Sequence, residues 1–231
     1  MRPMLLALIT ALAGFANVAP GSELKPQHAV YAVARDGKTV GDATYSLAGN
    51  PDGSWTLQSE TRGSAGMAKL VGLDVHEQST FRWDNGQAQG VRYDYKQDAA
   101  IKHKQRSIDF DWSAREARVH DNGKDFHYAI EPGTIDRSTV AVQLGVLLGA
   151  GAHDATLNVA QKDHLEQQRF AAQGEDSISV PAGTFKAIRV ERTDAAGKAR
   201  SWYAPQLTTL PVRVEQVQGD GSTIVMELRK R

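Results

Sequence analysis

The sequence predicts a mainly β protein, an antiparallel meander that curves into a half-barrel or barrel and holds one buried apolar helix at about residues 138–149. From about His28 onward, short segments alternate apolar with polar residues, which is the pattern of half-buried strands. Turn dipeptides separate these segments. A single long apolar stretch interrupts them. A sheet with so many strands is expected to curl rather than stay flat.

The N-terminus has the features of an export signal. Arg2 precedes an uncharged, helix-prone run at residues 4–13, and small residues follow up to Ala16. We expect cleavage after Ala16, with Ala19 as the latest alternative. A retained membrane anchor is a further alternative, but the run is shorter than the roughly 20 residues that cross a bilayer. The expected location is the periplasm, without a lipid anchor.

Beyond the signal, we expect a flexible segment at residues 17–27 and a single β-rich domain at residues 28–231. No linker rich in Pro, Gly or Ser divides this part of the chain. No later stretch is apolar for long enough to span a membrane, so no integral membrane segment is expected in the mature chain.

Composition narrows the classes of function. The chain has no cysteine, so disulfides, lipid attachment and cysteine-ligated metals are not expected. Basic and acidic residues are equal at 27 each, whereas a nucleic-acid-binding protein needs a basic surplus. We therefore expect no nucleic-acid partner. The one basic run, residues 102–106, is expected to be a solvated strand end or turn.

Seven segments show the alternation most clearly. Their apolar or inward positions are Trp55, Leu57 and Ser59; Ser79, Phe81 and Trp83; Val91, Tyr93 and Tyr95; Ile108, Phe110 and Trp112; Ile188 and Val190; Val212 and Val214; and Ile224, Met226 and Leu228. The turn pairs are Asp36-Gly37, Asp52-Gly53, Asn85-Gly86, Asn122-Gly123 and Asp220-Gly221. Such pairs accept positive φ and suit tight hairpins, so neighbouring strands are expected to pair.

The apolar stretch at residues 138–149 predicts a helix. Asp136 or Ser138 can cap its N-terminus, and Gly149 suits its C-terminus. The segment is apolar almost all round, so it must be buried against the sheet, and Gly145 would allow close approach. A strand of the same composition is the alternative. A shorter helical turn is expected at residues 65–70.

Motifs for catalysis and metal binding are incomplete. The segment Gly63–Gly66 has the wrong spacing for a serine-hydrolase elbow. His76-Glu77 begins like a zinc-protease helix, but Thr80 stands where the second histidine should be. No glycine-rich phosphate loop is present. The sequence therefore predicts no catalytic, cofactor-binding or metal-binding residue, and a Ser-His-acid site assembled in space is the catalytic alternative.

Large aromatic side chains fall on the apolar faces of the predicted strands. Inward rings in a curved sheet can line a ligand cavity, although they more often fill an ordinary core. The candidate ligand-lining residues are Trp55, Phe81, Trp83, Tyr93, Tyr95, Phe110 and Trp112.

Several segments together resemble one exported bacterial family, catalogued as domain of unknown function 3108. They are SISVPAGTFKAIRV at residues 177–190, WYAP at 202–205, LPVRVE at 210–215, EQSTF at 77–81 and the Phe110-Asp111-Trp112 strand. The family has no assigned activity and no agreed catalytic residues, so the resemblance implies no site. Its members resemble the half-barrels of periplasmic lipoprotein carriers in architecture, which is an analogy of fold.

The leading hypothesis is a periplasmic binding or carrier module that holds an apolar or amphipathic ligand, such as lipid, and performs no catalysis. One alternative is an envelope structural or interaction protein that binds a partner protein by strand addition at a sheet edge. A second alternative is a hydrolase with a spatially assembled site.

Overall fold

The computed structural model describes residues 23–100, 102–195, 197 and 199–231. The predicted signal peptide lies outside the described residues. The described chain forms one 14-stranded sheet in which every pair of neighbouring strands is antiparallel, together with two helices. The predicted fold class, a mainly β antiparallel meander with a buried apolar helix, is confirmed.

The strands and helices have the following bounds. The first eight strands are β1 (Gln27–Arg35), β2 (Lys38–Gly49), β3 (Trp55–Gly63), β4 (Asp74–Asp84), β5 (Gln87–Asp98), β6 (Lys104–Asp111), β7 (Glu116–Asp121) and β8 (Lys124–Ala129). The other six are β9 (Asp154–Ala160), β10 (Leu165–Val180), β11 (Gly183–Arg192), β12 (Ala199–Tyr203), β13 (Arg213–Val217) and β14 (Thr223–Lys230). The helices are α1 (Gly66–Leu70) and α2 (Thr139–Gly149).

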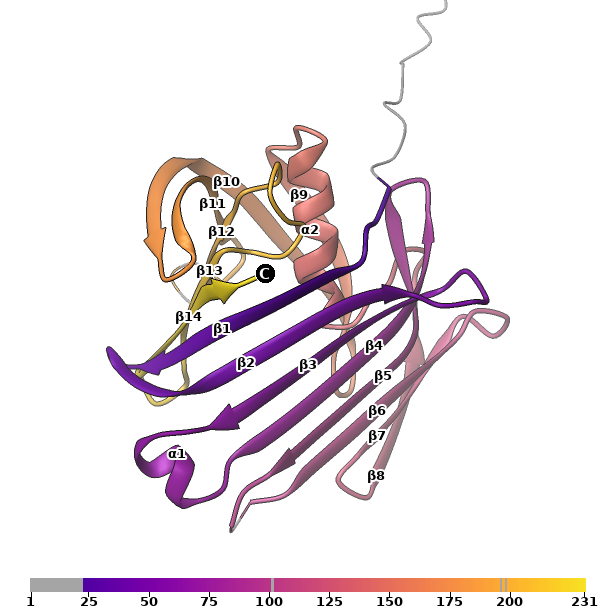
Figure 1. Ribbon diagram of the computed structural model, residues 1–231. Coiled ribbons are helices and arrows are strands. Elements are labelled where there is room, and N and C mark those ends of the chain that lie inside the picture. Colours follow the sequence, from indigo (N-terminus) through magenta and orange to yellow (C-terminus); the bar gives the residue numbers. More distant parts are fainter. Residues whose placement is uncertain (1–22, 101, 196, 198) are drawn as a thin grey trace, which may run out of the picture.

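The sheet consists of two meanders joined at the chain ends. Its order runs from β8 down to β1, then from β14 down to β9, so β1 pairs with β14 and the edges are β8 and β9. The sheet is not closed. Figure 1 shows its two arms curving toward each other with α2 between them. Part of the β9 edge is covered, because Ile135 bridges Val159.

The predicted turn pairs form hairpins. At three of them both residues have positive φ, with Asp36 and Gly37 at 49° and 74° as one example, which is the type I′ geometry that matches the twist of two antiparallel strands. The other two such turns are Asn85-Gly86 and Asn122-Gly123. Asp52-Gly53 and Asp220-Gly221 also lie between paired strands, with positive φ at the glycine.

Helix α2 fills the space between the arms. It begins one residue after the predicted start, and its buried residues include Val142, Leu144 and Val146. These side chains belong to a hydrophobic cluster that also draws on strands of both arms. Gly145 explains how close the helix comes, because a Cβ there would lie 1.8 Å from the carbonyl oxygen of Thr209.

Neither helix is long and apolar enough to cross a membrane within the part of the chain that the structure describes.

Replacing Gly145 with alanine should lower the stability of the fold by about 1–3 kcal/mol, because the added methyl group must push the backbone at Thr209 aside. Thermal and urea unfolding would measure the loss. Gly219→Ala is the matched control, since a Cβ at Gly219 meets nothing within 4 Å. Equal stability of the two variants would contradict the close packing of α2.

Candidate functional site

The seven candidate ligand-lining residues face the interior of the sheet, but they lie in two separate hydrophobic clusters. The larger cluster, which includes α2, contains Trp55, Phe81 and Trp83; the smaller contains Tyr93, Tyr95, Phe110 and Trp112. Phe81 is fully buried, and Tyr93 and Phe110 are 2% and 7% exposed. The other four rings are half-buried. These rings therefore contribute to packed cores, and the larger of the two cores is filled by the helix.

A polar network lies between the two clusters and centres on Glu77 of β4. Its carboxylate accepts hydrogen bonds from Tyr93 Oη at 2.7 Å, Ser138 Oγ at 2.7 Å, and Arg137 Nη2 and Nε at 2.7 and 3.0 Å. Burial alone would raise the pKa of Glu77, but the charge of Arg137 and these hydrogen bonds outweigh it and hold the pKa below its usual value. The Arg137 guanidinium in turn lies 4.7 Å from the ring centre of Tyr95.

Asp136 forms the second half of this network and is completely buried. It accepts hydrogen bonds from Ser79 Oγ at 2.6 Å, Thr139 Oγ1 at 2.8 Å, and the backbone N–H groups of Ser138 and Thr139 at 2.8 and 3.1 Å. Burial raises the pKa of its carboxyl, against the lowering effect of these bonds. Of the two predicted alternatives, Ser138 holds the N-cap position of α2, but its side chain makes no capping bond; Asp136 accepts the N–H groups there instead and ties the helix to β4.

Gln143 makes a further polar link between α2 and the β4–β5 hairpin. Its side chain accepts a hydrogen bond from the backbone N–H of Ala88 at 2.7 Å and donates one to the carbonyl of Gly86 at 2.9 Å. Together with Glu77 and Asp136, it fastens the N-terminal half of the helix. The sequence contains a signal for this attachment, because two polar residues stand in apolar surroundings. Glu77 shares a strand face with Phe81, and Gln143 interrupts an apolar helix.

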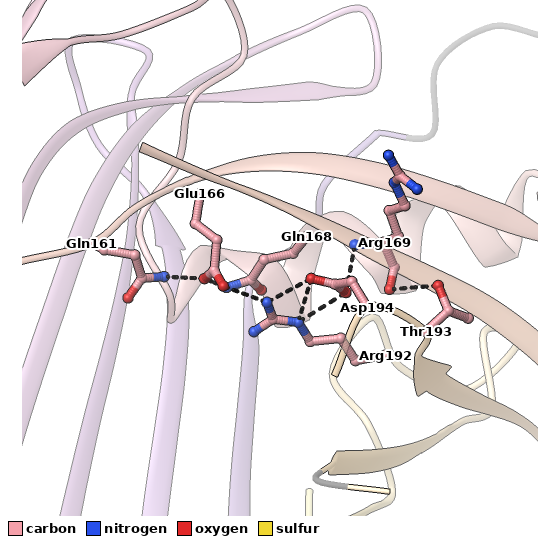
Figure 2. A network of polar contacts seen from close by, with 7 residues as sticks. All are labelled: Gln161, Glu166, Gln168, Arg169, Arg192, Thr193 and Asp194. Carbon is pink, nitrogen blue, oxygen red and sulfur yellow. Dashed lines mark hydrogen bonds and ion pairs between the residues drawn. The ribbon is translucent and has the colours of Figure 1, made fainter. Parts of the chain in front are cut away.

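Figure 2 shows a second polar cluster, formed by residues of β10, the end of β11 and the connections that follow β9 and β11. Arg192 Nη2 lies 2.5 Å from Glu166 Oε1 and 2.7 Å from Asp194 Oδ2. The hydrogen bonds from Arg192 hold the pKa of Asp194 well below its usual range. Gln161 donates to Glu166 at 3.1 Å, and its carbonyl accepts from Tyr128 Oη of β8 at 2.6 Å. This cluster therefore links the two edges of the sheet and has a structural role.

A hollow with a volume of about 650 Å³ lies on the face of the sheet turned away from α2. Residues that alternate with the inward-facing ones on β2–β7 supply most of its side chains, and we call it the outer hollow. It is lined by Thr44, Gln58, Ser59, Glu60, His76, Glu77, Gln78, Arg92, Asp94, Tyr95, Lys96, Gln105, Arg106, Ser107 and His120. Tyr95 is the one aromatic residue in this set, so the hollow is mainly a hydrogen-bonding surface. Alternation in the sequence marks most of these positions only as solvent-facing, so the hollow was not predicted from it.

Opposite charges are paired within the outer hollow. Arg92 lies 2.7 Å from Asp94 and 2.6 Å from Asp109, and Gln58 donates to Gln78 across β3 and β4 at 2.8 Å. The hydrogen bonds to Asp94 raise the pKa of Arg92 above its usual value. Since the charges balance one another, the surface offers donors and acceptors of both kinds and favours no single sign of ligand charge.

A serine, a histidine and an acid stand in one cross-strand row at the edge of the outer hollow. Ser107 pairs with His120 across β6 and β7, and His120 pairs with Asp125 across β7 and β8. His120 Nδ1 lies 2.7 Å from Asp125 Oδ1. Among the described residues, no hydrogen bond joins Ser107 to His120, and the side chain of Asp125 is 84% exposed. The residue types match a hydrolytic triad, but the buried acid and the serine contact that activate one are missing.

Glu60, Asp74 and His76 bring their ligand atoms within 4.8 Å of one another on the same face. His76 Nε2 lies 3.0 Å from Asp74 Oδ1, and Arg62 pairs with the Glu60 carboxylate. Arg62 and His76 therefore pair with the carboxylates of the cluster, and we assign no metal to it.

Replacing Glu77 with glutamine should lower stability at pH 7 by about 2 kcal/mol, because Arg137 loses a charged hydrogen-bond partner. The difference from the wild type should shrink as the pH falls through the lowered pKa of Glu77, since the protonated wild-type side chain no longer forms the ion pair. Urea unfolding at several pH values would test this, with the exposed Glu175→Gln as control. A difference independent of pH would contradict the ion pair.

Three comparisons place the chain among known proteins. No curated protein matches it. One solved structure that it resembles is described as a β-barrel-like protein of domain of unknown function DUF1849 from Brucella abortus, at 12% identity and a TM-score of 0.47, with 88% of this chain and 95% of the other covered. The family model described as protein of unknown function (DUF3108) matches residues 28–229. The chain therefore belongs to the DUF3108 family.

Proposed function

We propose that the protein is a binding or carrier module of the bacterial periplasm, without catalytic activity, that holds a polar ligand in the outer hollow. The observation that carries the proposal is the hollow itself, about 650 Å³ in volume and lined by amide, hydroxyl and charged side chains. This volume lies within the range of small-molecule sites. The location rests on the export signal expected from the sequence.

The lining favours a ligand rich in hydroxyl and amide groups. Gln58, Gln78 and Gln105 each offer both a donor and an acceptor, and the ion pairs around Arg92 leave little net charge. An oligosaccharide with N-acetyl groups has this chemistry. A ligand of high charge would have to break the existing ion pairs.

An apolar ligand among the aromatic rings, as the sequence analysis expected, is the second version of this proposal. It would need space that α2 occupies, so binding would require Asp136, Gln143 and Glu77 to release the helix. The outer hollow needs no such rearrangement, and for that reason we favour the polar ligand.

Titration of the isotope-labelled protein with an N-acetylated amino-sugar oligomer, a glucose oligomer and a fatty acid would separate the two versions. We expect the amino-sugar oligomer to shift backbone amide signals of β3–β6, with a loss of about tenfold in affinity in a Gln58→Ala/Gln78→Ala variant and none in Gln173→Ala. Shifts from the fatty acid alone, centred on α2, would favour the apolar ligand. Absence of any shift at millimolar concentration would contradict the proposal for these ligand classes.

A hydrolase is the second candidate function, because Ser107, His120 and Asp125 share one row. A fluorophosphonate probe, which reacts with activated serines, tests it directly. We expect no labelling of the wild-type protein, since Ser107 lacks a hydrogen bond to His120. Labelling that disappears in Ser107→Ala and persists in Ser179→Ala would establish the hydrolase and overturn the non-catalytic proposal.

A further inference from the structure

One end of the sheet carries an apolar tip, formed by two connections: residues 64–73 and, in the second, the described residues 99, 100, 102 and 103. The first joins β3 to β4 and contains α1, and the second joins β5 to β6. Met67 and Leu70 of α1 are 70% and 79% exposed, more than any other large hydrophobic residue that the structure describes. Figure 1 shows α1 projecting at the end of the sheet far from α2.

Backbone hydrogen bonds hold the tip in place, and its described side chains do not pack on the hydrophobic core. Helix α1 has no buried residue. It is held in place because Leu73 N–H donates to the carbonyl of Ala68 at 2.9 Å, and Ala100 N–H donates to the carbonyl of Val71 at 2.8 Å. Gly63 lets the chain pass closely, since a Cβ there would lie 2.5 Å from the backbone of Ala68. These hydrogen bonds join the two connections. Because Met67 and Leu70 bury little surface against the protein, packing does not explain why they are apolar.

Within the two connections the charge has one sign. Lys69, Lys102 and His103 lie in them, and Lys104 begins β6. The nearest acidic residues in the sequence, Asp74 and Asp98, lie just outside, at the ends of β4 and β5. All three lysines are exposed. Among the described residues none of the three forms an ion pair, whereas the neighbouring Asp98 is paired with Lys96 and His103. Exposed apolar side chains next to unpaired lysines are complementary to a partner that has anionic groups at its surface and an apolar layer beneath them.

We propose that the apolar tip docks on the surface of a bilayer that contains anionic lipids. Met67 and Leu70 enter the boundary between head groups and acyl chains, and Lys69, Lys102 and Lys104 lie at the phosphate level. An apolar protein surface would also cover Met67 and Leu70, but it would leave the three lysines without counter-charges. Met67, Leu70, Lys69 and Lys102 do not line the outer hollow, so docking does not depend on a ligand there. Docking would place the protein at a membrane surface.

A reporter at the tip tests the proposal. Because the chain has no cysteine, Leu70→Cys in the full chain can carry a single environment-sensitive fluorophore, and Lys186→Cys on β11 provides a matched exposed position far along the sequence. With vesicles of phosphatidylcholine and phosphatidylglycerol, we expect a blue shift and a several-fold rise in emission at position 70 and little change at position 186. Phosphatidylcholine alone should give a much weaker response.

Every variant keeps the same apolar run at residues 4–13. Differences in vesicle binding between variants therefore come from the tip. In the Leu70→Cys background, charge reversal by Lys69→Glu and Lys102→Glu should weaken the vesicle response about tenfold or more, and Lys186→Glu should leave it unchanged. For the unlabelled protein, Met67→Ser/Leu70→Ser should weaken co-sedimentation with the anionic vesicles about tenfold, without altering the thermal unfolding midpoint, because both side chains are exposed.

Three results would overturn the proposal. One is an unchanged signal at position 70 with anionic vesicles, which would leave the patch to a protein partner. Another is an equal response to phosphatidylcholine alone, which would remove the role of the lysines. The third is co-sedimentation that Met67→Ser/Leu70→Ser does not affect.

Discussion

The seating of α2 between the two arms of the sheet is the interaction on which the rest of the structure depends. A helix that is apolar almost all round can be stable in water only when protein surrounds it. The two meanders provide that environment, and their common hydrophobic cluster is built around the helix. Polar groups then fix its position: Asp136 satisfies its first N–H groups, and Gln143 bonds to the β4–β5 hairpin. Without α2, the open sheet would expose the inner faces of both arms.

This arrangement explains why polar chemistry gathers on the outer face. The inner face is occupied by α2, by the aromatic clusters and by the network of Glu77 and Arg137. Residues that alternate with the inner ones point away from the helix, and those of β2–β7 supply most of the lining of the outer hollow. The outer hollow and the apolar tip share β3 and β4, because the connection that carries α1 joins these two strands. A ligand site and a docking site would thus be mechanically connected through two paired strands.

Charged groups in this protein act in two physically different settings. Glu77 and Asp136 are shielded from water, so their hydrogen-bond partners determine whether the helix stays in place. The ion pairs of the outer hollow are exposed, and such pairs contribute little to stability. Their exposed donors and acceptors can bond to a ligand while the pairs stay intact, which suits a binding surface better than a structural one.

The local features of this protein follow from its amino-acid sequence. Alternation located the strands, Asp-Gly and Asn-Gly pairs located the hairpins, and the apolar run at residues 138–149 located α2, because each depends on neighbouring residues and on the period of one element. Alternation also predicted that the seven aromatic rings lie on the apolar faces of their strands. Only the tertiary structure decided that β14 lies beside β1, that the rings are divided between two packed clusters, and that Glu77 meets Arg137, 60 residues away. These features, like the outer hollow, depend on which distant strands and loops pack together, and local periodicity carries no information about that choice.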